Sequence, residues 1–128
     1  VRASIAIPGM FWPKQLDDMQ LVDGAVLDVV PVKSLWLSGV SPIVAVDIGK
    51  YAEKPSRPDN LYSILTRAFS IQARELTLKT LAECADLTIS PELGDIDVWN
   101  LTGVSECIKR GAQAAEERLQ DLIRLLNS

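Results

Sequence analysis

The sequence predicts an α/β fold, because short apolar strands alternate along it with longer amphipathic helices. Runs of β-branched and apolar residues at 43–48 and 87–89 have the length and composition of strands. Residues 59–85 and 102–126 instead carry apolar side chains every three or four positions, as helices do. Strands and helices that alternate in this way form a sheet covered by helices. A hydrophobic fraction of 48% in 128 residues suits one ordered domain with a core of its own.

The first part of the chain is predicted to contain one short strand. Residues 1–7 are an apolar stretch that ends at a proline and a glycine, a pair that starts a loop. The bulky residues at 10–13 are expected to pack over the core, and the alternative is that they line an apolar substrate channel. Residues 20–22 predict a strand that ends at Asp23.

A short helix and a central strand are predicted next. Pro31 is a preferred first residue of a helix and Gly39 a preferred stop, so we expect a helix over residues 32–38. The apolar run at 43–48 predicts a parallel strand that is buried on both faces. Residues 51–58, rich in proline and charge, are expected to form an exposed linker.

The longest predicted helix begins at Asp59 or Asn60, either of which can cap it, and continues to about Ala85. One side of this helix is apolar and is expected to face the core. The other side is a polar stripe that is expected to face solvent, formed by Ser63, Arg67, Ser70, Arg74 and Thr77.

The last third of the sequence predicts a strand at 87–89, an irregular connection and a closing helix over residues 102–126. Within that helix Glu106 and Arg110 are one turn apart, so their side chains can form an ion pair.

Composition argues against several classes of partner. A net charge of −4 gives no basic surface for nucleic acid. The chain has no histidine, and Cys84 and Cys107 are far apart, so we expect two buried free thiols and no zinc site. The remaining metal candidates are scattered aspartates without ligand spacing, for which surface or capping roles are expected: Asp28, Asp47, Asp95 and Asp97. Neither a metal nor a cofactor is expected.

Asp23 is the strongest candidate for chemistry. Without histidine, proton transfer must fall to a carboxylate. Asp23 ends a strand and precedes glycine, a place where α/β enzymes present functional groups. By itself an Asp-Gly pair more often marks an ordinary turn. Ser41 and Ser105 lack the glycine pattern and the strand-to-helix setting of a nucleophile elbow, so neither is expected to be a nucleophile.

The residues around Asp23 resemble the second conserved block of patatin-like phospholipases. The blocks that carry the resemblance are residues 1–11, 21–26 and 29–32, together with the strand at 43–47 and the segments 108–111 and 114–115. The sequence is most similar to bacterial members related to the catalytic domain of neuropathy target esterase. The resemblance implies that residues 1–128 are the C-terminal portion of one patatin-like domain, a doubly wound three-layer α/β fold with helices on both faces of the sheet.

The resemblance also implies a Ser–Asp dyad that hydrolyses lipid acyl esters. Asp23, Gly24 and Ala25 match the family's DG[GA] motif, with Asp23 as general base and Gly24 as the residue that allows a tight turn. The serine and the glycine-rich oxyanion loop would lie in an N-terminal portion absent from this chain. The alternative is a non-catalytic patatin-like module that binds lipid or protein.

The expected partners follow from this division. They are a lipid or ester substrate, the missing N-terminal half of the domain, and a second copy of the chain. Because the strand at 43–48 has few partner strands in this chain, we expect an unpaired sheet edge and an apolar exposed surface.

Overall fold

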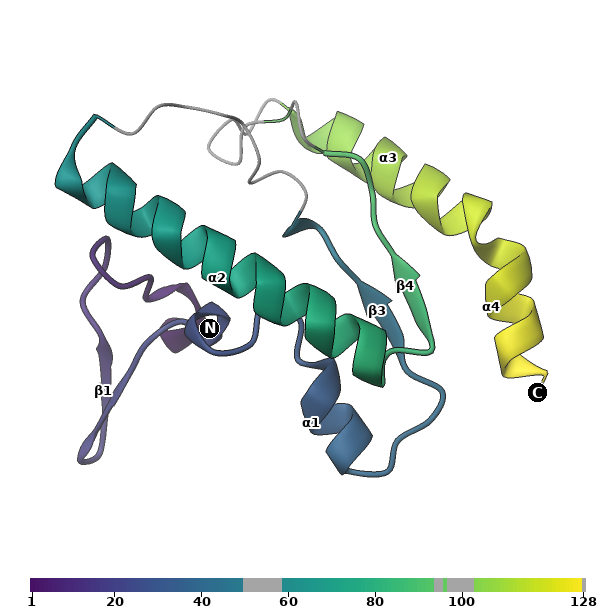
Figure 1. Ribbon diagram of the computed structural model, residues 1–128, viewed down its shortest axis with the longest axis horizontal. Helices are drawn as coiled ribbons and strands as arrows, with labels where there is room; N and C mark the ends of the chain where they lie inside the picture. Colours follow the sequence, from purple (N-terminus) through teal and green to yellow (C-terminus); the bar gives the residue numbers. More distant parts are fainter. Residues whose placement is uncertain (50–58, 94–95, 97–102, 128) are drawn as a thin grey trace.

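The computed structural model describes residues 1–49, 59–93, 96 and 103–127 (Figure 1). Four helices lie in these ranges, namely α1 (Val32–Leu37), α2 (Leu61–Cys84), α3 (Val104–Glu117) and α4 (Leu119–Leu126). Four strands of three residues accompany them, namely β1 (Lys14–Leu16), β2 (Met19–Leu21), β3 (Val44–Val46) and β4 (Leu87–Ile89). Two short 3-10 turns complete the order, η1 (Ala3–Ile5) and η2 (Gly24–Val26).

Strands β3 and β4 form a parallel pair joined by the long helix α2. Val44 lies opposite Leu87, and Val46 lies opposite Ile89. A helix that connects two parallel neighbouring strands is the βαβ unit of α/β proteins. In Figure 1 the pair lies between α2 on one side and the α3–α4 segment on the other. The predicted α/β class, with helices on both sides of the parallel strands, is therefore confirmed.

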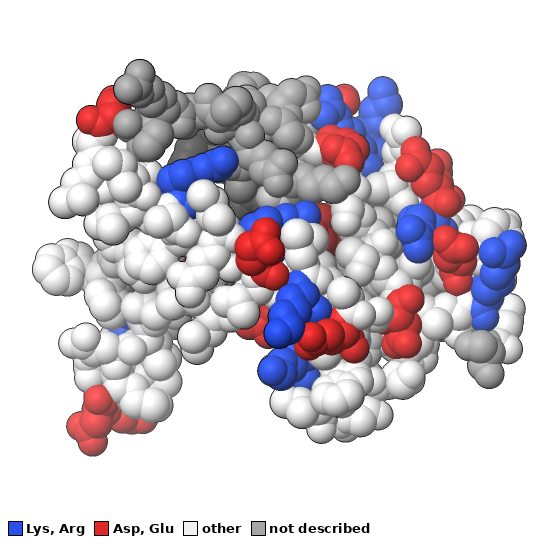
Figure 2. Space-filling view, in the orientation of Figure 1, with Lys and Arg blue, Asp and Glu red and all other residues white. Residues whose placement is uncertain are grey.

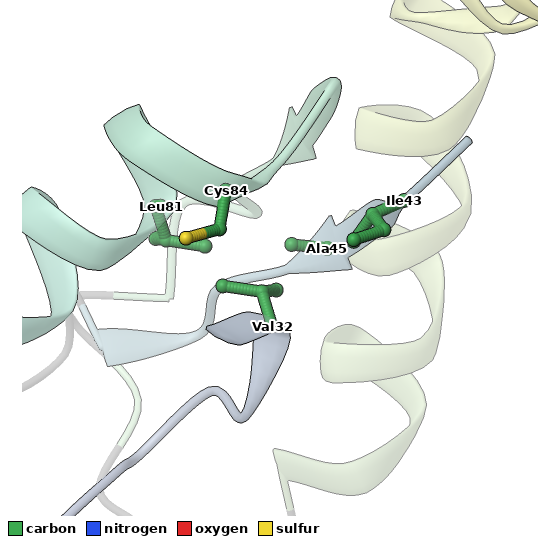
Figure 3. Packing of buried hydrophobic residues seen from close by; sticks show 5 residues of the cluster. All are labelled: Val32, Ile43, Ala45, Leu81 and Cys84. Atoms are coloured by element: carbon green, nitrogen blue, oxygen red, sulfur yellow. The ribbon is translucent and has the colours of Figure 1, made fainter. Parts of the chain in front are cut away.

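The core lies where α1, α2 and β3 meet (Figure 3). It consists of five buried residues that contact one another, Val32, Ile43, Ala45, Leu81 and Cys84. The free thiol of Cys84 is therefore part of the packing, as predicted, whereas Cys107 in α3 is only half-buried. Removal of these apolar side chains from water is the main stabilising contribution at this junction.

Helix α2 begins where its capping signal predicts. The side chain of Asn60 accepts a hydrogen bond of 2.8 Å from the backbone N–H of Ser63, and the Ser63 hydroxyl lies 3.2 Å from the backbone nitrogen of Asn60. This reciprocal pair satisfies two N–H groups that the helix itself leaves free. The helix ends at Cys84 because Ala85 is extended.

The orientation of α2 differs from the prediction. Its predicted polar stripe turns inward: Ser63, Arg67, Ser70 and Arg74 are half-buried and Thr77 is buried. Its apolar side is exposed instead, and Leu61, Ile64, Leu65, Phe69 and Leu76 face away from the chain. The inward hydroxyls need no outside partner, because Thr66, Ser70 and Thr77 donate to carbonyls three or four residues earlier in the helix.

Strand β3 is buried on one face only, so its predicted burial on both faces is wrong for this chain. Ala45 is 3% exposed, whereas its neighbour Val46 is 55% exposed. The reason is one-sided cover: helices α1 and α2 pack on the Ala45 face, and the described residues leave Val44 and Val46 exposed on the other face.

An antiparallel hairpin, β1–β2, precedes these elements and was not predicted. Lys14 lies opposite Leu21, and the two-residue turn contains Asp17 with φ of 50°. Aspartate tolerates this left-handed conformation better than most residues. The predicted strand at 20–22 is therefore real but begins one residue earlier, and it is not hydrogen-bonded to β3 or β4.

The closing helix is divided into α3 and α4 at Arg118, where a single continuous helix was predicted. Its predicted ion pair is present, with Glu106 Oε1 2.9 Å from Arg110 Nε. Among the described residues, no helix combines the length and the apolar character that crossing a bilayer requires.

Candidate functional site

Asp23 lies between β2 and the short turn η2, and hydrogen bonds fix it on both sides. Its Oδ1 accepts a hydrogen bond of 2.8 Å from the backbone N–H of Ala25, so Asp23 caps η2. Its own backbone N–H donates to the carbonyl oxygen of the buried residue Ala6 at 3.0 Å. The segment near the N-terminus thus holds the Asp23 backbone, while Ala25 orients the carboxylate.

The Asp23 carboxylate is half-buried, and one of its two oxygens is available to accept a proton. Among the described residues, Ala25 is its single hydrogen-bond donor, and that bond goes to Oδ1. An ionised carboxylate can accept several hydrogen bonds, so Oδ2 remains able to accept a proton. This arrangement suits a general base whose second oxygen receives the proton of a hydroxyl group.

Gly24 does not have the geometry that the sequence predicted for it. Its φ is not in the left-handed region, and a Cβ added there would meet no atom within 4 Å. The turn at Asp23–Val26 is therefore open to residues other than glycine. Ala25 contributes through its backbone N–H, so the DGA motif acts here as an aspartate cap on a short turn.

Asp47 is a second carboxylate with a defined environment, and it is buried, so its predicted surface position is wrong. It is 2% exposed at the carboxyl end of β3. Its Oδ2 lies 2.6 Å from Arg74 Nη1 on α2, and its Oδ1 accepts from the Gly49 N–H at 2.9 Å. A buried carboxylate with a charged partner and a second donor is electrically satisfied, so Asp47 serves structure at this point.

The other aspartates do not form a metal centre in the described residues. Asp28 is half-buried, while Asp95 and Asp97 lie outside the described ranges. No group of three or more carboxylate or cysteine side chains in those ranges is arranged to hold a metal ion.

Neither weak nucleophile candidate has a setting that would activate it. Ser41 is exposed in the loop before β3, and Ser105 is exposed in the first turn of α3. Both serines thus occupy the loop and helix-start positions that their sequence contexts predict.

The chain exposes much more surface than a closed domain of its size. Its accessible surface is 9755 Å², whereas a compact protein of 14.0 kDa is expected to expose roughly 6,700 Å². Many large apolar side chains are exposed: Phe69 is 66% exposed, and the other apolar residues on that side of α2 face solvent with it. Figure 2 shows mostly uncharged surface over the N-terminal half of α2, interrupted by a basic group, while charged side chains gather over the C-terminal half of α2 and along α3 and α4.

Comparison with known proteins identifies related sequences. An uncharacterized NTE family protein of Mycobacterium tuberculosis is 28% identical over 151 residues, which cover 97% of this chain, and a Mycobacterium bovis protein matches equally well. Lysophospholipase NTE1 of Candida albicans is 35% identical over 54 residues, or 42% of this chain and 4% of that protein. No protein-family model matches the chain.

The chain matches only part of the length of these relatives. It spans 26% of the length of the mycobacterial relatives, and nearly all of it takes part in the alignment. The similarity therefore extends across nearly the whole chain, in which Asp23, β3, α2 and β4 lie, and does not rest on a single motif. The resemblance to the patatin-like proteins of the NTE group that the sequence predicts is confirmed by these relatives.

Proposed function

We propose that this chain is the C-terminal portion of a patatin-like domain that hydrolyses lipid acyl esters, as a phospholipase A or a lysophospholipase. Asp23 acts as the base of a Ser–Asp dyad, and an N-terminal portion of the same domain supplies the serine. The observation that carries the proposal is the Asp23 carboxylate, with one oxygen held by Ala25 and the other available. The name of the Candida albicans relative, a lysophospholipase, supports the choice of substrate class.

The geometry suggests how Asp23 works in this reaction. Oδ2 accepts the proton of the serine hydroxyl as the serine oxygen attacks the ester carbonyl, while the Ala25 N–H holds Oδ1 and prevents rotation of the carboxylate. The protonated Asp23 then gives its proton to the leaving alcohol. In the second half, Asp23 takes a proton from water, which attacks the acyl-serine. Asp23 then returns this proton to the serine oxygen as the acyl–serine bond breaks, so the fatty acid is released and both groups are regenerated.

The exposed apolar surface supports a division of the domain into two portions. The chain exposes more surface than a closed protein of 14.0 kDa, including many large apolar side chains. Exposed apolar surface of this kind is normally covered by more chain or by a partner. On this proposal residues 1–128 alone are catalytically silent and associate with the N-terminal portion. The same exposed surface also supports the alternative, a patatin-like module that binds lipid or protein without catalysis.

The discriminating observation is the coding sequence upstream of Val1. A GxSxG elbow and a glycine-rich oxyanion loop there support the hydrolase. An upstream patatin-like sequence in which both are replaced supports the non-catalytic module.

The kinetic test is Asp23→Asn in the intact protein. Asparagine keeps an oxygen for the Ala25 N–H, so the turn is retained while the base is lost. We expect kcat for a short-chain nitrophenyl ester to fall at least about a hundredfold with an unchanged circular dichroism spectrum. The matched control is Asp28→Asn, which changes another half-buried carboxylate five residues later and should leave kcat near wild type. Near wild-type hydrolysis by Asp23→Asn would assign the base to another residue.

A further inference from the structure

A hollow of about 280 Å³ lies at the C-terminal end of α2, where α1 packs beside this helix (Figure 1). Its wall includes the indole of Trp36 on α1, together with the carboxylates of Glu83 in the last turn of α2 and Asp86 just after it. The apolar side chains of Val40 and Ile43 also line it. Ligand pockets measure roughly 300–1,000 Å³, so a hollow of this size suits a small molecule. We call it the Trp36 hollow.

The carboxylates of the Trp36 hollow have no cationic partner among the described residues. Glu83 forms no ion pair there, not even with Lys79 one turn earlier on α2, and no Lys or Arg lines the hollow. Asp86 uses Oδ2 to accept the backbone N–H of Ile43 at 2.7 Å, so its Oδ1 stays available. The hollow therefore presents two uncompensated carboxylates.

The end of α2 adds to this negative character. The last carbonyl groups of a helix lack partners within the helix and carry partial negative charge, which favours a cation nearby. Helix α2 is 24 residues long and has no basic residue in its last turn to offset that charge. A cation that enters the hollow therefore meets the helix end and the two carboxylates together.

The wall suits an organic cation better than a metal ion. Calcium and magnesium require six or more oxygen ligands around them, and no group of three or more candidate ligand side chains occurs in the described ranges. An indole ring instead attracts ammonium groups to its face through a cation–π interaction. Trp36 is 54% exposed, so much of its ring is not covered by the chain. Val40 and Ile43 can contact the carbon groups attached to the cationic nitrogen.

We propose that the Trp36 hollow binds a small organic ammonium cation, with the indole of Trp36 against the cationic head and the carboxylates of Glu83 and Asp86 beside it. The ligand is a quaternary ammonium such as choline or a primary amine such as ethanolamine, which share a positive nitrogen bonded to carbon. The inference goes beyond the proposed hydrolysis and does not rest on it, because neither Asp23 nor Ala25, which orients it, lines the hollow.

The experiment is fluorine NMR of the intact protein labelled with fluorotryptophan, in which the Trp36 signal is the one that Trp36→Phe removes. We expect choline chloride to shift this signal saturably, with a Kd in about the millimolar range, because the ring is partly exposed to water. Dimethylbutanol, the uncharged analogue of choline with the same shape, should not shift it. Sodium chloride at the same ionic strength should not shift it either.

Charge variants test the two carboxylates. Glu83→Gln should raise the Kd for choline about threefold, as expected for one exposed charge. Adding Asp86→Asn should raise the loss to at least about tenfold, while asparagine keeps an oxygen for the Ile43 N–H. The matched control is Glu75→Gln, which changes an exposed glutamate two turns earlier on α2 and should leave the Kd unchanged.

A ring variant gives a second readout. Saturation transfer from the protein to the choline methyl protons should be lost in Trp36→Leu and kept in Trp12→Leu, which removes another exposed indole. Tighter binding of choline than of ethanolamine would assign a quaternary head, and the opposite order would assign a primary amine; either order supports the cation site. Equal shifts with choline and dimethylbutanol, or an unchanged Kd in the double charge variant, would overturn the proposal.

Discussion

The ion pair between Asp47 and Arg74 provides a test of how helix α2 is held on strand β3. Arg74→Met removes the charge and keeps most of the aliphatic stem that packs along α2. Asp47 then remains a carboxylate at a position that is 2% exposed, with Gly49 as its remaining donor. An unpaired buried charge is among the few single changes with a large effect on stability.

The size of the effect follows from burial. Breaking a buried ion pair by removing one partner costs about 3–5 kcal/mol. The Arg74 side chain is 19% exposed, so water can reach part of the vacated space, and we expect the lower end, about 3 kcal/mol. For 128 residues this corresponds to a fall in Tm of about 10 °C.

The assay is urea unfolding of the intact protein at two salt concentrations, because a buried pair is screened little by salt. The control is Glu106→Gln, which removes an exposed ion pair one turn apart on α3 and should cost no more than about 0.5 kcal/mol. Asp47→Asn in the Arg74→Met background should restore part of the loss, because no charge is then buried. A loss below about 1 kcal/mol for Arg74→Met would refute the reasoning that the pair fixes α2 on β3.

Two further changes test the core and the start of α2 in the same unfolding assay. Leu81→Ala empties a buried core position and should lower the free energy of unfolding by about 2–4 kcal/mol. Its control is Leu78→Ala, exposed one turn earlier on α2, which should cost less than about 1 kcal/mol in residues 1–128 alone. Equal losses would show that the core is elsewhere. Asn60→Ala removes the cap of α2 and should lower the free energy of unfolding by about 1 kcal/mol, with faster hydrogen exchange at the Ser63 amide. Unchanged exchange would show that the cap is not needed.

The elements with strong local signals could be predicted from the sequence. Pro31 and Gly39 mark helix α1, and Gly39 adopts the positive φ of 72° that a helix stop requires. The capping residue Asn60 marks α2, and short apolar runs mark β3 and β4. These signals lie within a few residues of the feature that they specify, so no knowledge of tertiary contacts is needed.

The features that depend on partners distant in sequence could not be predicted. The burial of Asp47 is decided by Arg74, 27 residues away, and nothing near Asp47 announces it. The hairpin β1–β2 has a two-residue turn without glycine or asparagine, the residues that usually reveal such turns. For Asp23, the sequence located the residue, and the structure added how Ala6 and Ala25 hold it.

The inverted helix α2 connects the fold to the proposed assembly. Amphipathic periodicity separates the two faces of a helix but does not say which face meets its own chain. Here the Asp47–Arg74 pair holds the polar face inward, and the hydroxyls on that face are satisfied by carbonyls of their own helix. If α2 were rotated to bury Phe69 and its apolar neighbours, Arg74 would move away from Asp47. The Asp47 charge would then remain buried and unpaired. As long as that pair is kept, the apolar side of α2 faces outward, and the described residues leave it exposed.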